Sequence, residues 1–212
     1  MTEAAAVAAA YIALGEKGLN FGAAGNVSLR QGEHMLITPT GARADTLSAD
    51  KIVVATLDGT VVGAGRPSSE WEMHAEIYRA YPAAGAVVHT HSDACVAMSA
   101  LRRRLPPFHY MIAAFGGDDV RCAGYDTFGT SGLAHAAVTA LDGRKACYLA
   151  NHGMICHGPT LEAAVGLAER LEVLSRQYLM ALTIGDPALL TPDEMAEVHA
   201  RYRALSYDNM KK

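Results

Sequence analysis

Residues 86–91 are Ala-Val-Val-His-Thr-His, a short apolar, β-favouring run that leads directly into two histidines. Because side chains alternate between the two faces of a strand, His89 and His91 are predicted to project from the same face, about 6.5 to 7 Å apart at the backbone. Two neutral imidazoles at that separation can bind one metal ion, and two or three such ligands leave a position open for chemistry. The same pattern also fits two histidines at an exposed strand end, so the pair alone does not decide between these interpretations.

The length and composition are those of a globular enzyme. The 212 residues suffice for one α/β domain with a sizeable core, and 50% are hydrophobic and 19% charged. The net charge of −4 gives no reason to expect nucleic acid or an anionic membrane as a partner. Four cysteines without a CxxC pair predict reduced thiols in a cytoplasmic protein, and no apolar run reaches the 18 or so residues of a membrane span.

Helical and strand patterns alternate along the chain. The helical patterns are predicted to cover 2–17, 69–81, 93–101, 131–141, 160–184 and a last helix that Pro192 begins. Strands or extended segments are predicted at 27–29, 35–37, 52–56, 60–62, 86–91, 108–114, 120–125, 146–150 and 154–156. Ser69 and Glu72 match a capping box at the start of the second helix. We therefore predict a single α/β domain over 1–212, a mostly antiparallel central sheet covered by helices on both faces.

Two further residues could join the histidine pair. His152 follows the predicted strand at 146–150, and strand ends are where α/β sheets place functional groups. With His89 and His91 it would make a three-nitrogen metal site, although His152 alone would be interpreted as a turn residue. Glu70, at a predicted helix start, could serve as an acid/base beside the metal or only interact with the helix dipole. The remaining histidines are predicted to be surface or core residues, with His109 left open: His34, His74, His109, His135, His157 and His199.

A second set of small and hydroxyl residues suggests an anion pocket. It comprises Gly25-Asn26, Thr40-Gly41 and Ser68-Ser69. Amides, hydroxyls and a helix N-terminus are what a phosphate site needs when the protein has no net positive charge. Each piece is common by itself, and Ser69 has a competing role as the helix cap, which would leave Ser68 as the freer hydroxyl. Together the three pieces predict a phosphorylated ligand.

Several longer motifs resemble one known family. They are Gly-Leu-Asn-x-Gly-x-Ala-Gly-Asn-Val-Ser at 18–28, Leu-Ile-Thr-Pro-Thr-Gly at 36–41, Pro-Ser-Ser-Glu-Trp at 67–71, Val-Val-His-x-His at 87–91, His-Tyr-Met-Ile-Ala-Ala at 109–114, Thr-Phe-Gly-Thr at 127–130 and His-Gly at 152–153. In this order they resemble the class II aldolase and adducin family, which includes zinc-dependent L-fuculose-1-phosphate aldolases, L-ribulose-5-phosphate 4-epimerases and the adducin head domain. The fuculose-phosphate aldolase branch is the most similar.

The resemblance implies a role for each matching residue. The zinc ligands would be Glu70, His89, His91 and His152, and Mn²⁺ or Co²⁺ could occupy such a site. The substrate phosphate would be held by Asn26, Thr40, Gly41, Ser68 and Ser69. Tyr110 would reach into the site of a neighbouring subunit, since family members are typically cyclic tetramers, and Phe128 would line the aldehyde side. Family aldolases also use a tail tyrosine, for which Tyr207 is the nearest candidate.

The implied reaction is the reversible cleavage of a ketose 1-phosphate to dihydroxyacetone phosphate and an aldehyde. The substrate would be L-fuculose 1-phosphate or a related deoxy- or methylthio-pentulose 1-phosphate. Zinc would act as a Lewis acid, Tyr110 would accept the C4 hydroxyl proton and Glu70 would protonate C3. An epimerase, dehydratase or decarboxylase could use the same metal site. A non-catalytic, adducin-like interaction domain is the remaining alternative, against which the complete ligand set argues.

Overall fold

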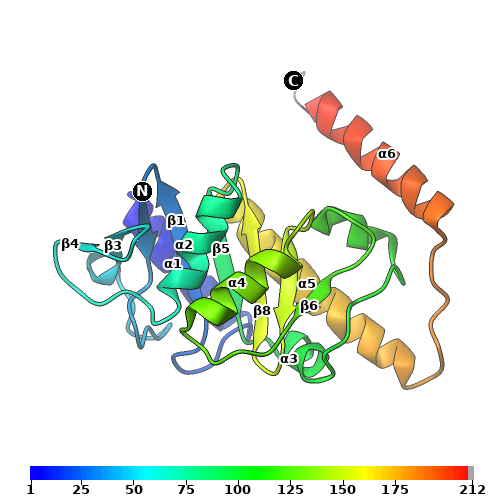
Figure 1. Cartoon of the computed structure of the whole chain (residues 1–212), viewed down its shortest axis with the longest axis horizontal. Helices are drawn as coiled ribbons and strands as arrows, with labels where there is room; N and C mark the ends of the chain where they lie inside the picture. The colour runs from blue at the N-terminus through cyan, green and yellow to red at the C-terminus, as the bar shows by residue number, and fades with distance from the viewer. Residues whose placement is uncertain (210–212) are drawn as a thin grey trace.

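A computed structural model describes residues 1–209, and side chains as far as residue 205. Its core is an eight-stranded sheet with the order β4-β3-β2-β1-β5-β8-β7-β6 (Figure 1). The strands are β1 (Asn26–Gln31), β2 (His34–Ile37), β3 (Val53–Thr56), β4 (Val61–Val62), β5 (Ala86–Thr90), β6 (Arg121–Ala123), β7 (Ala146–Leu149) and β8 (Gly153–Gly158). The helices are α1 (Glu3–Glu16), α2 (Trp71–Ala80), α3 (Asp93–Ala100), α4 (Ser131–Ala140), α5 (Leu161–Leu182) and α6 (Pro192–Asn209), with 3₁₀ turns η1 (Ala49–Lys51) and η2 (Tyr110–Phe115).

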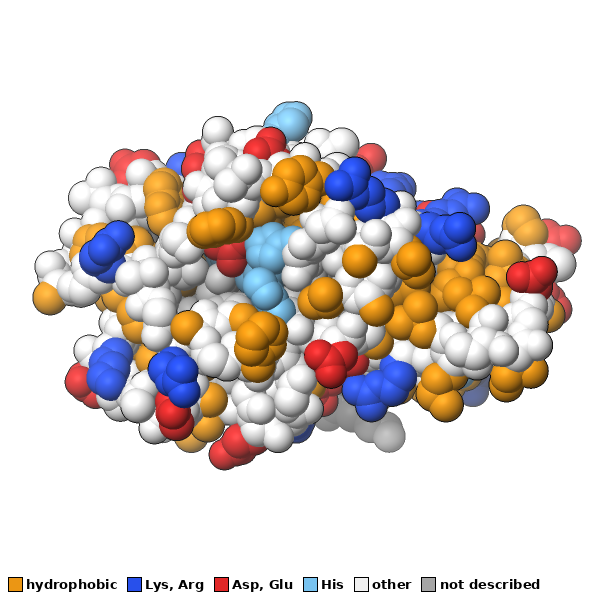
Figure 2. Space-filling model, turned by 90° about the horizontal axis from the view of Figure 1, so that it is seen from below, with side chains coloured by type: hydrophobic (Ala, Val, Ile, Leu, Met, Phe, Trp, Pro, Cys, Tyr) orange, Lys and Arg blue, Asp and Glu red, His pale blue; other side chains and the backbone are white. Residues whose placement is uncertain are grey.

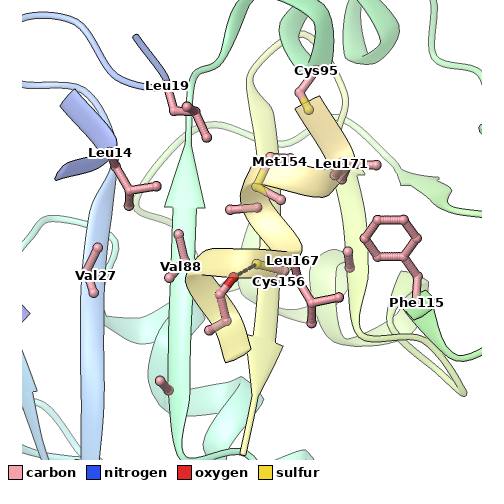
Figure 3. Close-up of a cluster of buried hydrophobic side chains, with 14 of the residues drawn as sticks. Leu14, Leu19, Val27, Val88, Cys95, Phe115, Met154, Cys156, Leu167 and Leu171 are labelled. Atoms are coloured by element: carbon pink, nitrogen blue, oxygen red, sulfur yellow. Dashed lines mark hydrogen bonds between the residues drawn. The ribbon is translucent and has the colours of Figure 1, made fainter. Parts of the chain in front are cut away.

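Strand β5 lies inside the sheet, between β1 and β8, and every one of its residues is buried. Ala86 and Val88 pack into one hydrophobic cluster with residues of α1, α3 and α5, as Figure 3 shows for Val88 and its neighbours. Val87 faces the opposite cluster, which α2 and α4 cover. Helices therefore cover both faces of the sheet, as predicted, and a strand buried on both faces has an apolar rather than an alternating sequence.

The sheet is mixed, so the prediction of a mostly antiparallel sheet holds only in part. Strand β6 pairs with β7 in parallel, with Cys122 opposite Tyr148, whereas the other neighbouring strands pair antiparallel. A parallel pair requires a crossover connection of a dozen or more residues, and α4 lies in the connection between β6 and β7. The strand–helix–strand order at 121–149 was the signal for this parallel edge.

Two local predictions were wrong. The segment predicted as extended at 108–114 is mostly the 3₁₀ turn η2, and the His109 side chain caps it by accepting the Met111 N–H through Nδ1 at 3.1 Å. Ser69 does not cap α2: the N-cap residue is Glu70, without a side-chain cap bond. The preceding hydroxyl, Ser68 Oγ, accepts the Glu70 N–H instead, at 3.3 Å.

Helix α3, which follows the histidine pair, is capped from outside its own sequence. Its N-cap residue Ser92 makes no side-chain cap bond. Instead the Glu172 carboxylate on α5 accepts the N–H groups of Ala94 at 3.1 Å and Cys95 at 3.0 Å. A carboxylate at a helix N-terminus satisfies unpaired donors and opposes the positive end of the dipole. This contact holds α3, and with it the end of β5, against α5.

The described cysteines Cys95, Cys122, Cys147 and Cys156 are all free thiols. Among residues 1–209, no helix combines the length and apolarity needed to cross a membrane. Helix α6 extends away from the rest of the molecule (Figure 1), and the Tyr207 side chain lies outside the described residues.

We predict that Glu172→Gln lowers the free energy of unfolding by about 1 to 3 kcal/mol at neutral pH, because an NH₂ group replaces one of the two oxygens that accept the Ala94 and Cys95 N–H groups. Burial would raise the pKa of Glu172, but the hydrogen bonds from Ala94 and Cys95 outweigh burial and hold this pKa below its ordinary value of 4.5. The stabilisation is therefore complete above pH 4.5 and is lost as the pH falls through the lower folded-state pKa.

Urea unfolding of the unmodified protein and of the Glu172→Gln variant, at neutral pH and below pH 4.5, measures the difference in the free energy of unfolding. The exposed neighbour Gln177 on the same helix offers a control, since Gln177→Ala removes no such contact. A stability difference for Glu172→Gln that does not shrink at low pH would contradict the charged cap.

Candidate metal centre and phosphate cleft

Four side chains from separate parts of the chain converge at one end of the central strands of the sheet. His89 lies in β5, His91 just beyond it, His152 in the turn between β7 and β8, and Glu70 at the N-cap of α2. One potential ligand atom from each lies within 4.8 Å of every other. The predicted common face of His89 and His91 is confirmed, since their Nε2 atoms are 2.9 Å apart.

The hydrogen bonds of His89 orient a lone pair into this cluster. Its Nδ1 lies 2.7 Å from the Met154 carbonyl, which only accepts, so Nδ1 carries the proton and the neutral ring has its lone pair on Nε2. That Nε2 lies 3.2 Å from Glu70 Oε2. The other carboxylate oxygen, Oε1, is buried without a hydrogen-bond partner among the described residues and lies 3.4 Å from His152 Nε2. Three imidazoles and a buried carboxylate facing one point are a donor set that fits a divalent cation.

The pKa values indicate that the cluster sets neutral imidazoles beside an ionised carboxylate. Burial and the neighbouring His89 lower the pKa of His91 to about 3 and that of His152 to about 4, so both rings are neutral at physiological pH. Burial would raise the pKa of Glu70, but the adjacent histidines reverse this and hold it well below its ordinary value. Burial would lower the pKa of His89, but Glu70 keeps it above its ordinary value. A divalent cation would replace the proton that His89 otherwise holds beside this carboxylate.

The glycine-rich loop contributes a residue that sequence reasoning missed. Asn20 Oδ1 accepts the backbone N–H of His91 at 3.2 Å, which fixes the chain just after β5. Gly25 packs directly on this side chain: its φ is +72°, and a Cβ there would overlap Asn20. The signal was present as an asparagine inside the glycine-rich stretch 18–26, but the contact to a residue 71 positions away requires the fold.

A cleft of about 380 Å³ opens beside the cluster. All the predicted phosphate-site residues line it, together with three of the four clustered side chains: Asn26, Thr40, Gly41, Ser68, Ser69, Glu70, His91 and His152. The turns that carry Thr40-Gly41 and Ser68-Ser69 meet through two backbone hydrogen bonds. The Thr40 N–H donates to the Arg66 carbonyl at 3.1 Å, and the Ser68 N–H donates to the Thr38 carbonyl at 3.0 Å. In Figure 2 histidine side chains lie at the bottom of a hollow that hydrophobic side chains border.

The remaining predicted residues lie farther from the cluster. Phe128 lines the cleft and is 66% exposed, so it is an apolar wall open to solvent. Tyr110, on η2, is 48% exposed and is not among the residues that line the cleft of its own chain. Of the two serines, Ser68 is buried and its hydroxyl accepts the Glu70 N–H, whereas Ser69 is exposed. The expectation that Ser68 is the freer hydroxyl was therefore wrong.

Comparison with known proteins identifies the family. The family described as "Class II Aldolase and Adducin N-terminal domain" matches residues 5–179. The chain belongs to this family, as the sequence motifs predicted.

Relatives with assigned activities are similar over most of their length. A 5-methylthioribulose-1-phosphate/5-deoxyribulose-1-phosphate aldolase of Rhodospirillum rubrum is 46% identical over 88% of this chain and 84% of its own. An L-fuculose phosphate aldolase of Escherichia coli is 45% identical over 88% and 87%, respectively. A solved L-fuculose 1-phosphate aldolase superposes with a TM-score of 0.91 at 34% identity, covering 96% of this chain and 98% of the other. The fold is thus that of a class II aldolase.

Replacing one clustered histidine is expected to weaken metal binding. We predict that His152→Ala lowers the affinity for a divalent metal at least 100-fold, because one nitrogen donor is lost and Glu70 Oε1 loses its neighbour. His135→Ala, on the exposed side of α4, is the matched control. Metal analysis after dialysis and competition with a chromophoric chelator measure both variants, and equal affinity for the two would exclude His152 as a ligand.

Removing metal is expected to destabilise the fold. A ligand that binds only the folded state at 100 times its dissociation constant contributes about 2.7 kcal/mol, or roughly 5 to 11 °C in melting temperature for a chain of this length. Differential scanning fluorimetry with and without a chelator, followed by readdition of Zn²⁺, tests this. A melting temperature that changes neither with the chelator nor with Zn²⁺, in protein without bound metal, would favour a non-catalytic domain.

Proposed function

We propose that this protein is a metal-dependent aldolase that reversibly cleaves a ketose 1-phosphate to dihydroxyacetone phosphate and an aldehyde. The observation that carries the proposal is the placement of the His₃Glu cluster beside a cleft that residues with amide and hydroxyl groups also line. Such a cleft suits a substrate with a phosphate at one end and oxygens near the cluster. The sequence identity of 46% to the 5-methylthioribulose-1-phosphate/5-deoxyribulose-1-phosphate aldolase and of 45% to the L-fuculose phosphate aldolase supports the same conclusion.

Each group in the cleft has a chemical task in this reaction. Glu70, His89, His91 and His152 would hold the metal, for which we propose Zn²⁺, with Mn²⁺ or Co²⁺ as alternatives. The bound metal would supply Lewis-acid stabilisation of charge that develops on the substrate oxygens. Glu70 would move the proton at C3, returning it during cleavage and removing it during condensation.

The phosphate would lie in the other half of the cleft. Asn26, Thr40, Gly41, Ser68 and Ser69 would hold it through N–H and O–H donors, so the site needs no lysine or arginine. The Ser68 hydroxyl, which accepts from Glu70, keeps its own hydrogen free to donate. Phe128 would line the aldehyde side, where an apolar terminal group would contact its exposed ring.

The exposed Tyr110 supports an assembly with sites between subunits. Because it does not line the cleft of its own chain, we propose that it reaches the cleft of an adjacent subunit in a homotetramer and accepts the C4 hydroxyl proton. A tail residue such as Tyr207 could join it there. We also propose that residues 1–212 form a single domain and that the protein is cytoplasmic. Free thiols support the cytoplasmic location, at Cys95, Cys122, Cys147 and Cys156.

A substrate panel tests the reaction. L-Fuculose 1-phosphate, 5-methylthioribulose 1-phosphate and 5-deoxyribulose 1-phosphate would be incubated with metal-loaded protein, and dihydroxyacetone phosphate would be followed by coupled oxidation of NADH. The expected result is its release from at least one of them. NMR of the same mixtures would reveal an epimerised, dehydrated or decarboxylated product, any of which without dihydroxyacetone phosphate would overturn the proposal.

We predict that Glu70→Gln, assayed at saturating metal, lowers kcat by about 10² to 10⁴ while metal remains bound, because an amide cannot transfer the C3 proton. The control is Glu76→Gln on the same helix, whose carboxylate pairs with Arg79 at the surface. A metal-loaded Glu70→Gln variant that cleaves substrate at the unmodified rate would exclude the proton-transfer role.

A further inference from the structure

A chain of buried polar side chains leads from Glu70 into the interface between β1 and α2. It runs from Asn26 through His74 and Ser28 to Tyr78, with two residues from β1 and two from α2. All four side chains are buried, and His74, Ser28 and Tyr78 have no exposed surface. Buried polar groups are costly unless they are hydrogen-bonded, so such a row inside a packed helix–sheet interface requires an explanation.

The donor and acceptor at each link can be assigned from the end at Glu70. A carboxylate only accepts, so Asn26 Nδ2 donates to Glu70 Oε2, at 2.9 Å. This orientation turns Asn26 Oδ1 toward His74 Nε2, with which it forms a short hydrogen bond. The amide oxygen only accepts, and His74 Nε2 must therefore carry the ring proton.

The remaining links follow from that tautomer. His74 Nδ1 is then an acceptor and takes the Ser28 hydroxyl hydrogen at 2.7 Å. Ser28 Oγ in turn accepts from the Tyr78 hydroxyl at 2.7 Å. Burial lowers the pKa of His74 to about 3, so the ring is neutral and has a single N–H to place. Every hydrogen in the row thus points toward Glu70.

We propose that His74 is a positioning residue that fixes the orientation of the Asn26 amide, and through it the Glu70 carboxylate. The inference rests on the proposed function, because it concerns how the metal and phosphate halves of that site are held. Asn26 has two amide hydrogens: one is bonded to Glu70, and the residue lines the cleft where a phosphate would lie. One amide would therefore serve both halves of the site.

The alternative amide orientation would damage both halves at once. A flipped Asn26 would place its oxygen against Glu70 Oε2 and withdraw its donors from the carboxylate, an arrangement of two acceptors without a hydrogen. The N–H of His74 excludes it, because only the oxygen of Asn26 can accept that hydrogen. Replacing a residue that hydrogen-bonds to a metal ligand commonly lowers the metal affinity or the activity by about 10- to 100-fold.

Two substitutions at His74 separate this role from simple packing. A glutamine amide can place an N–H near the position of Nε2 and so keep the bond to Asn26, whereas an asparagine amide reaches only the position of Nδ1. We expect His74→Gln to remain within about threefold of the unmodified protein and His74→Asn to lose about 10- to 100-fold in metal affinity, with a higher KM for the ketose 1-phosphate. A purely structural role would make the two variants equally defective.

Chelator competition with Zn²⁺ measures the metal affinity. Steady-state assays with a ketose 1-phosphate give KM and kcat, and the melting temperature reports whether each variant folds. Should both His74 variants fail to fold, Ser28→Ala tests the same row, because it removes the donor that holds Nδ1 as an acceptor and frees the ring to present a lone pair to Asn26. A Zn²⁺ affinity and KM that stay unchanged in His74→Asn or Ser28→Ala would overturn the inference.

The outcomes distinguish this inference from the proposed function. If the unmodified protein binds Zn²⁺ but cleaves no ketose 1-phosphate, the proposed function fails while the affinity measurements still decide the role of His74. If the unmodified protein binds none of Zn²⁺, Mn²⁺ and Co²⁺, both are overturned.

Discussion

The structure depends on a strand that is buried on both faces and yet ends in imidazoles. β5 lies between β1 and β8 with no exposed residue, and His89, at 0% exposure, cannot rely on water for its polar atoms. Burying such a ring without partners would cost several kcal/mol. The Met154 carbonyl satisfies one nitrogen and Glu70 faces the other, so the start of β8 and the start of α2 must meet at this strand end. The convergence of Glu70 with the histidines follows from this requirement.

The buried carboxylate of Glu70 places a second constraint on its surroundings. It needs donors or positive charge on every side, since an isolated charge in a protein interior is strongly unfavourable. On one side Asn26 supplies an N–H, and on the other the three histidines stand where a cation would complete the coordination. The turns proposed to hold the phosphate lie beside this arrangement because the segments at 38–41 and 66–68 hydrogen-bond to each other. The proposed metal and substrate phosphate could therefore share one cleft that no lysine or arginine of the described residues lines.

Prediction from the sequence succeeded where local patterns dominate. The alanine-rich α1, the Asp58-Gly59 hairpin and the long α5 follow from propensity, turn chemistry and periodicity. It failed where contacts distant in sequence decide the outcome. Ser69 fits a capping box, but Ser68 is drawn to the Glu70 N–H and α2 begins one residue later than such a cap requires. The parallel edge at β6 likewise depends on its pairing with β7, which short windows do not contain.

By itself, the sequence determined the class of fold, the family and the residues of the candidate site, because His-x-His on a strand and the phosphate-site turns are local patterns with a chemical meaning. Only the tertiary structure decided which atoms face one another. It showed that His89 presents Nε2 to Glu70, that Asn20 holds the backbone of His91, and that His74 belongs to a polar row that leads from Glu70. The physical reason is that hydrogen-bond direction and tautomer depend on partners dozens of residues away, which only the packed sheet and helices bring within reach.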